Sequence, residues 1–160
     1  MRSVLLLLAL LASSASLQAR AQEARRPTNG CVVCHGEQAR QHERGLHQRA
    51  GIGCVDCHGG DSSALEAPEA HGSDLVALRG SSESVEACGS CHGDVPRMRL
   101  YGLRTDQLSL YATSQHGMKL AEDPQADVAT CVSCHGSHEV LAHTDTRSPV
   151  HKFNQVETCG

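Results

Sequence analysis

One short pattern occurs four times in this chain of 160 residues and constrains its fold more than any other feature. Each copy reads C-x-x-C-H-G, and the four sequences are CVVCHG, CVDCHG, CGSCHG and CVSCHG. The residues are Cys31, Cys34 and His35; Cys54, Cys57 and His58; Cys88, Cys91 and His92; and Cys131, Cys134 and His135. With 11 histidines in 160 residues, chance would place histidine at all four positions roughly 2 times in 100,000.

The spacing within each copy is that of covalent haem attachment. Two cysteines three residues apart lie on the same side of one helical turn, so both sulfurs can form thioethers to the vinyl groups of one haem. The adjacent histidine then stands beside the iron as its proximal ligand. We therefore expect four haem c groups in this chain, held by these eight cysteines and four histidines.

Two other uses of paired cysteines compete with this interpretation. Zinc ribbons place four thiolates around one tetrahedral ion, and eight cysteines would supply two such sites, but zinc does not require the four adjacent histidines. A disulfide framework has scattered cysteines rather than close pairs that are each followed by histidine. The pattern favours haem attachment over both alternatives.

The composition fits an interior that is not filled by protein alone. With two Tyr, one Phe and no Trp, the side chains that usually build a core are nearly absent. We expect a mainly α and coil fold organised around haems, with little or no sheet. Residues 37–50 and 105–122 are predicted helices, the second closed by Gly117 or by the turn at Asp123-Pro124. Residues 58–74, rich in Gly, Ser and Ala, are predicted to be loop.

The first residues read as a secretory signal peptide, residues 1–21. Arg2 is followed by an apolar run and by Ala19-Arg20-Ala21, which predicts cleavage before Gln22 and export to the periplasm. The alternative is a membrane anchor, but an apolar run of about nine residues is roughly half of what a bilayer crossing needs. We therefore expect no direct membrane span in this stretch, and residues 22–160 form the predicted multihaem cytochrome domain.

Removal of residues 1–21 leaves 12 basic and 18 acidic residues, a formal charge of −6. That balance disfavours nucleic acid as a partner, because nucleic-acid binding needs a basic surface.

The ninth cysteine, Cys159, belongs to none of the four motifs. The final stretch VETCG repeats four of the five positions of VEACG before the third motif, so we expect Cys159 to open a fifth motif in which this chain is truncated. A fifth haem is then expected if the chain continues past Gly160. The alternative is a free or intermolecular thiol at a natural terminus.

The histidine supply indicates how the iron atoms are ligated. Outside the motifs the mature chain has seven histidines and two methionines, Met98 and Met118, which favours bis-histidine haems of low potential. His138 follows His135 by three residues, so in a helix both would lie on one face, and His138 could serve only a neighbouring haem. The same argument applies to His42, seven residues after His35.

The run from Tyr111 to Gly160, with its Ser-x-His-Gly segment and its C-x-x-C-H-G-x-H motif, resembles the repeating unit of periplasmic multihaem c-type cytochromes. These include tetrahaem carriers and relatives of hydroxylamine oxidoreductase and octahaem tetrathionate reductase. The resemblance implies His116 and His138 as distal ligands, and His47 and His71 resemble two further distal positions. His42 and His151 remain alternates, and His143 fits no family position.

Both the motifs and the resemblance predict electron transport. An array of closely spaced haems passes electrons while the protein sets spacing and ligation. We expect an exported electron carrier between a quinol-oxidising membrane complex or another cytochrome and a terminal reductase. The alternative is the N-terminal part of a multihaem reductase or oxidoreductase of small nitrogen or sulfur compounds, which needs one haem with an open coordination position. The sequence therefore favours a carrier over an enzyme without deciding between them.

Overall fold

The structure is a computed structural model that describes residues 29–160. Within them the chain forms helices joined by turns and coil, and this part contains no strand. The expectation of a mainly α and coil fold is confirmed. The signal peptide expected at residues 1–21 lies outside the described residues.

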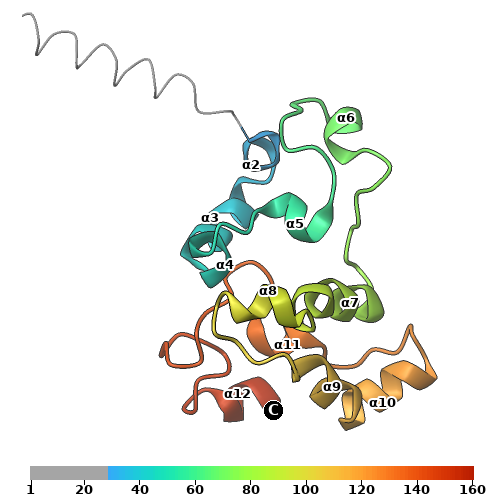
Figure 1. Cartoon of the computed structure of the whole chain (residues 1–160), viewed down its shortest axis with the longest axis vertical. Helices are drawn as coiled ribbons and strands as arrows, with labels where there is room; N and C mark the ends of the chain where they lie inside the picture. The colour runs from blue at the N-terminus through green and yellow to red at the C-terminus, as the bar shows by residue number, and fades with distance from the viewer. Residues whose placement is uncertain (1–28) are drawn as a thin grey trace, which may run out of the picture.

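Short helices follow one another along the long axis of the molecule (Figure 1). The N-terminal region, residues 29–78, contains α2 (Gly30–Cys34), α3 (Gly36–Arg44), α4 (Leu46–Arg49), α5 (Cys54–His58) and α6 (Ala67–His71). The C-terminal region, residues 79–160, contains α7 (Ser81–His92), α8 (Val95–Arg99), α9 (Gln107–Ala112), α10 (Gln115–Glu122), α11 (Cys131–His135) and α12 (Gln155–Cys159). None of these helices has the length and apolar character that a membrane crossing requires.

The second and fourth motifs start their own helices through the residue before their second cysteine. Asp56 accepts a hydrogen bond of 2.7 Å from the backbone N–H of Gly53, and Ser133 accepts one of 3.0 Å from the N–H of Thr130. Each bond satisfies a backbone donor at the helix start, which has no partner within the helix. The motif sequence itself therefore begins α5 and α11 at the first cysteine.

The glycine after the motif histidine ends both helices. Gly59 and Gly136 have φ of +68° and +76°, a conformation that glycine adopts without the steric cost of a side chain. At Gly59 a Cβ atom would also lie 2.3 Å from the carbonyl oxygen of Asp74. The chain therefore turns away sharply after the motif.

The predicted helix over 37–50 is wrong as a single element. It divides at Gly45 into α3 and α4, because the N–H of Leu46 bonds to the carbonyl of Val140 at 2.8 Å instead of to its own helix. A long-range contact thus overrides the local preference for helix.

The predicted helix over 105–122 is also divided, into α9 and α10. Ser114 caps α10 by accepting a hydrogen bond of 3.1 Å from the N–H of Gly117. The helix ends at Glu122, so the turn at Asp123-Pro124 closes it and the Gly117 alternative is wrong. Gly117 is instead buried in close packing, where a Cβ would lie 2.1 Å from the carbonyl oxygen of Tyr111.

The predicted loop over 58–74 contains a helix, α6. Pro68 stands in its first turn, where the missing N–H costs nothing, and the helix carries His71 as its last residue. The abundance of small residues in this stretch concealed the helix.

The apolar core is very small and lies in one region only. The buried hydrophobic side chains of the described residues are Val85, Met98, Leu120, Ala126 and Leu141, all in the C-terminal region. Many large hydrophobic side chains are exposed instead, among them Leu100 and Leu103. The protein part alone therefore buries little apolar surface, which is the main driving force of folding.

Candidate functional site

The four motifs lie in chain order along the molecule. Their helices α2, α5, α7 and α11 follow one another down the long axis in Figure 1. None of the nine cysteines, all of which lie in the described residues, forms a disulfide, and eight of them stand on these helices. The motifs are therefore arranged as a row and not as one central cluster.

Thiols of successive motifs are neighbours. A hydrogen bond between the thiols of Cys88 and Cys131 is the main cause that raises the pKa of Cys88 and lowers the pKa of Cys131 to about 7. Burial, followed by the nearby Cys91 thiol, raises the pKa of Cys57. Burial and then the Cys31 thiol likewise raise the pKa of Cys54. Each motif thus adjoins the next.

Two motif residues, Cys57 and His135, are exposed to solvent and yet also lie against other protein atoms. The side chains of Cys57 and His135 are exposed to solvent, yet burial is the main cause that raises the pKa of Cys57 and lowers the pKa of His135. Protein atoms therefore cover one side of each group while the other side is open to solvent. The open side is where a bound cofactor could lie.

Three motif histidines each face one other histidine ring. The ring centres of His35 and His71 are 6.2 Å apart, and those of His47 and His92 are also 6.2 Å apart. The third pair is His58 and His138, with centres 6.3 Å apart. The partners stand 36 to 80 residues apart in the chain. The structure thus brings together three of the four predicted distal histidines with three proximal ones.

The separation of these rings fits two axial ligands of one metal ion. A metal–nitrogen distance of about 2 Å on each side, with each nitrogen about 1.1 Å from its own ring centre, places two opposed ring centres about 6.2 Å apart. Ring centres in ordinary aromatic contact lie about 4.5–7 Å apart, a range that includes the same value. The distance is therefore compatible with an iron atom between the rings, and what distinguishes these pairs is that each joins a motif histidine to a candidate distal histidine.

His58, the histidine of the second motif, is held in the tautomer that leaves Nε2 free for a metal. Its Nδ1 lies 3.0 Å from the carbonyl oxygen of Val76, which can only accept a hydrogen bond, so Nδ1 carries the proton. The lone pair of His58 is then on Nε2 and free to bind a metal. The sequence gives no signal for Val76, because its contribution is a backbone carbonyl.

One backbone seam positions two of the facing histidines. Residues 44–46, between α3 and α4, run beside residues 138–140, with the Leu46 N–H bonded to Val140 and the guanidinium of Arg44 bonded to Glu139 at 2.8 Å. His47 directly follows residues 44–46, and His138 is the first of residues 138–140. The same contact thus directs a histidine of the N-terminal region to the third motif and one of the C-terminal region to the second.

His138 reaches the second motif from coil and not from a helix. α11 ends at His135, and Gly136 turns the chain, so the two histidines do not share a helical face. The geometric reason given by the sequence, a common helix, is therefore wrong. His138 nevertheless lies opposite His58 and not opposite His135.

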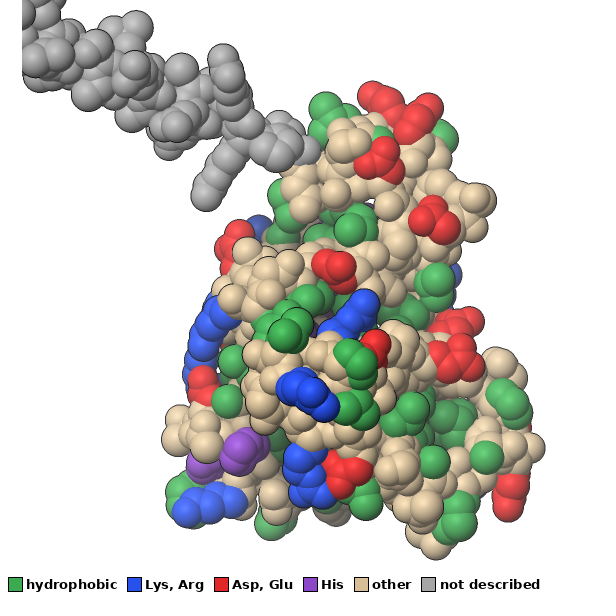
Figure 2. Space-filling view, viewed as in Figure 1, with side chains coloured by type: hydrophobic (Ala, Val, Ile, Leu, Met, Phe, Trp, Pro, Cys, Tyr) green, Lys and Arg blue, Asp and Glu red, His purple; other side chains and the backbone are tan. Residues whose placement is uncertain are grey.

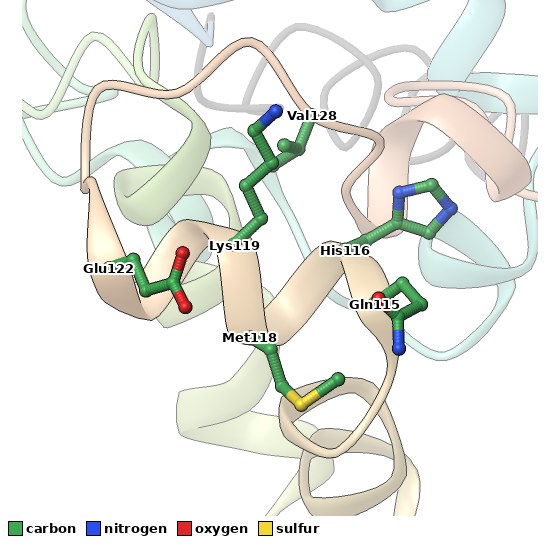
Figure 3. A pocket seen from close by; sticks show the side chains of 6 residues that line it. All are labelled: Gln115, His116, Met118, Lys119, Glu122 and Val128. Carbon is green, nitrogen blue, oxygen red and sulfur yellow. The ribbon is translucent and has the colours of Figure 1, made fainter.

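The fourth motif lacks a facing histidine. Among the described residues no histidine ring is opposed to His135 at the separation of the three pairs. His116, the remaining predicted distal ligand, projects from the first turn of α10 and lines a hollow of about 420 Å³ (Figure 3). The other lining residues are Gln115, Met118, Lys119, Glu122 and Val128.

The three remaining histidines, His42, His143 and His151, differ in their surroundings. His151 is buried against Phe153, and the Phe153 N–H donates to its Nδ1, which leaves the ring proton on Nε2 and makes His151 a poor ligand in this state. His42, in the last turn of α3, contributes to the lowered pKa of both His47 and His138, for which burial is the main cause. His143 is exposed.

The described residues contain no group of three or more His, Cys, Asp or Glu side chains arranged to hold a metal ion. A zinc ribbon needs four ligands around one ion, whereas the facing histidines come in twos. No protein family, curated protein or solved structure that was compared with the chain matches it.

Proposed function

We propose that this chain is an exported multihaem c-type cytochrome that transfers electrons through four covalently bound haems. The observation that carries the proposal is the set of three histidine pairs with ring centres 6.2–6.3 Å apart, each containing one motif histidine. A chance arrangement of surface histidines has no reason to repeat one separation three times. The eight motif cysteines would hold the haems, and export to the periplasm would follow from residues 1–21.

The ligand set favours electron transfer over substrate chemistry at three of the sites. When both axial positions are taken by histidine, the cofactor supplies one-electron chemistry and has no position left for a substrate. The chain's own residues fix the histidines, exclude part of the solvent and set the order of the sites. The row of motifs supports a path from the first to the fourth. Partners of such a carrier are a quinol-oxidising membrane complex or a cytochrome as donor and a terminal reductase as acceptor.

The small core supports the same proposal. The described part of the chain buries five hydrophobic side chains, which is little for a stable domain of this size. Covalently bound macrocycles would cover the open sides of Cys57 and His135 and supply the missing apolar contacts. A chain folded around haems is therefore expected to lose its structure without them.

The reductase alternative has one place where it could operate, the fourth motif. His135 is the motif histidine that no other ring faces in the described residues, so a site with an open position would be there. Substrates would be small nitrogen or sulfur compounds. If His116 binds at this site instead, the alternative loses its open position.

Electron paramagnetic resonance tests the ligand assignment. Replacement of His47, His71 or His138 by Ala should each convert one haem in four from low-spin to high-spin, while haem attachment through the cysteines is retained. His143→Ala is the matched control and should change nothing. Unchanged low-spin signals in all three variants would contradict the assignment.

The same measurement decides the fourth site. If the carrier proposal holds throughout, the wild-type protein is entirely low-spin and His116→Ala creates one high-spin haem. A wild-type protein with one high-spin haem in four that binds carbon monoxide would favour the reductase.

A further inference from the structure

The tip of the N-terminal region presents exposed apolar side chains around the first motif. On α2, Val32 and Val33 are 40% and 61% exposed, and Leu65 nearby is 59% exposed. The Gly30 N–H donates to the Ser62 carbonyl at 2.8 Å, so α2 packs directly on the segment that leads to Leu65. These three side chains thus belong to one end of the molecule, where Figure 1 shows α2 and α6 together.

An acidic rim adjoins this apolar surface. Residues 59–75, which include Leu65, contain four acidic residues and neither lysine nor arginine. All four are exposed and none forms an ion pair with a described residue; they are Asp61, Glu66, Glu69 and Asp74. On the face shown in Figure 2, acidic side chains gather over the end that carries α6, and most of the Lys and Arg side chains lie further down.

The histidine pair nearest this tip is also open to solvent. His35 follows α2, His71 ends α6, and both side chains are exposed. Both residues of this pair come from the N-terminal region, whereas the other two pairs each join the two regions. The first site is therefore the one at the end of the row and close to the surface, as exchange of electrons with another protein requires.

We propose that this tip, made of Val32, Val33 and Leu65 beside the acidic rim, docks a redox protein whose contact face is rich in lysine and arginine. The inference rests on the proposed function and names its partner. Opposite charges across an interface accelerate association, and electron-transfer complexes use small interfaces. A second copy of this chain would bring the same acidic rim against itself, so the rim excludes that occupant.

The step at this interface is the transfer of one electron. The partner is oxidised by one electron, the chain is reduced by one electron, and no covalent bond forms or breaks. The first site takes the electron or gives it up, according to which protein is reduced at the start.

The experiment uses the haem-loaded mature chain and, as probe, a lysine-rich monohaem cytochrome c. The tip variant is Glu66→Lys with Glu69→Lys, and the control is Asp127→Lys with Glu157→Lys, which changes the net charge equally on exposed residues of the C-terminal region. All variants retain Arg25 and Arg26, which lie outside the described residues. Stopped-flow spectroscopy gives the second-order rate constant at several salt concentrations.

The expected result at low salt is a rate constant about tenfold lower for the tip variant and changed less than about twofold for the control. The wild-type rate should fall as salt is added, because salt screens the rim. Equal rates for the two variants, or a wild-type rate without salt dependence, would overturn the docking proposal. A chain that dithionite cannot reduce would instead contradict the proposed function itself.

Discussion

The C-terminal and N-terminal regions of this molecule differ in the hydrophobic side chains that they bury. The C-terminal region contains all the buried hydrophobic side chains of the described residues, including Val85 on α7 and Leu120 on α10. In the N-terminal region only Gly30 and Gly45 are buried. The C-terminal region therefore has a small core of its own, while the N-terminal region has none. If the proposed function holds, haems at the two motifs of the N-terminal region take the place of that core, so that packing stabilises one region and cofactors stabilise the other.

The largest effect that separates the regions is expected from loss of haem attachment. With Cys31, Cys34, Cys54 and Cys57 all replaced by Ser, residues 29–78 should exchange amide hydrogens almost as fast as an unfolded chain, because no apolar core remains to hold them. With Cys88, Cys91, Cys131 and Cys134 all replaced by Ser, amides around the buried apolar side chains of the C-terminal region should keep part of their protection. Hydrogen exchange with mass spectrometry measures both.

One hydrogen-exchange result would contradict this difference between the two regions. If residues 29–78 keep their protection after loss of both haems of that region, the N-terminal region is stabilised by something other than haem or buried hydrophobic side chains.

A smaller effect is expected at the seam that joins the regions. Gly45→Ala would place a Cβ 3.0 Å from the carbonyl oxygen of His138 and 3.3 Å from the N of Val140. Residues 44–46 and 138–140 must then move apart. Overpacking of this kind lowers stability by about 1–3 kcal/mol. Because the seam directs both His47 and His138, part of the high-spin signal should appear at two haems together.

The matched control for the seam is Gly36→Ala, where the nearest atom is the flexible end of Arg40 at 3.6 Å. It should leave the spin states and the thermal unfolding midpoint unchanged. A Gly45→Ala protein with wild-type spectra would show that the two histidines are positioned independently of the seam.

The smallest effect is expected from the exposed ion pairs at the same seam. The hydrogen bond from Arg44 is the main cause that lowers the pKa of Glu139, and Arg147 contributes to the shift. A lowered folded-state pKa gives stability that is present above the unfolded pKa and is lost as the pH falls through the folded value. Glu139→Gln should therefore lower the unfolding midpoint slightly at pH 7 and have no effect below the lowered pKa.

Glu157→Gln is the control for this titration, because Glu157 is exposed and forms no ion pair in the described residues. A pH-independent effect of Glu139→Gln would assign its role to packing and not to charge.

The sequence predicted the helical class because the motif spacing is itself a helical feature. The starts of α5 and α11 were not predicted, since the contribution of Asp56 and Ser133 depends on backbone geometry. The break at Gly45 could not be predicted, because its cause is a segment some 95 residues further along the chain. Long-range contacts of this kind have no local signature.

The candidate site was likewise predictable from the sequence only in part. His47, His71 and His138 could be selected as candidates from the sequence, yet which motif each one faces depends on the fold and required the structure. Their role as ligands remains a prediction. The structure did not bring His116 opposite His135, and the backbone carbonyl of Val76 that orients His58 has no signature in the sequence.

Intact-mass spectrometry of the exported, mature chain tests the central claim most directly. The account predicts one species, residues 22–160 plus four haem groups, that keeps its mass under denaturing conditions because the bonds through the eight motif cysteines are covalent. Native alkylation of the same sample should then label Cys159 alone. A product with the mass of the apoprotein, or one that carries stoichiometric zinc, would contradict the account.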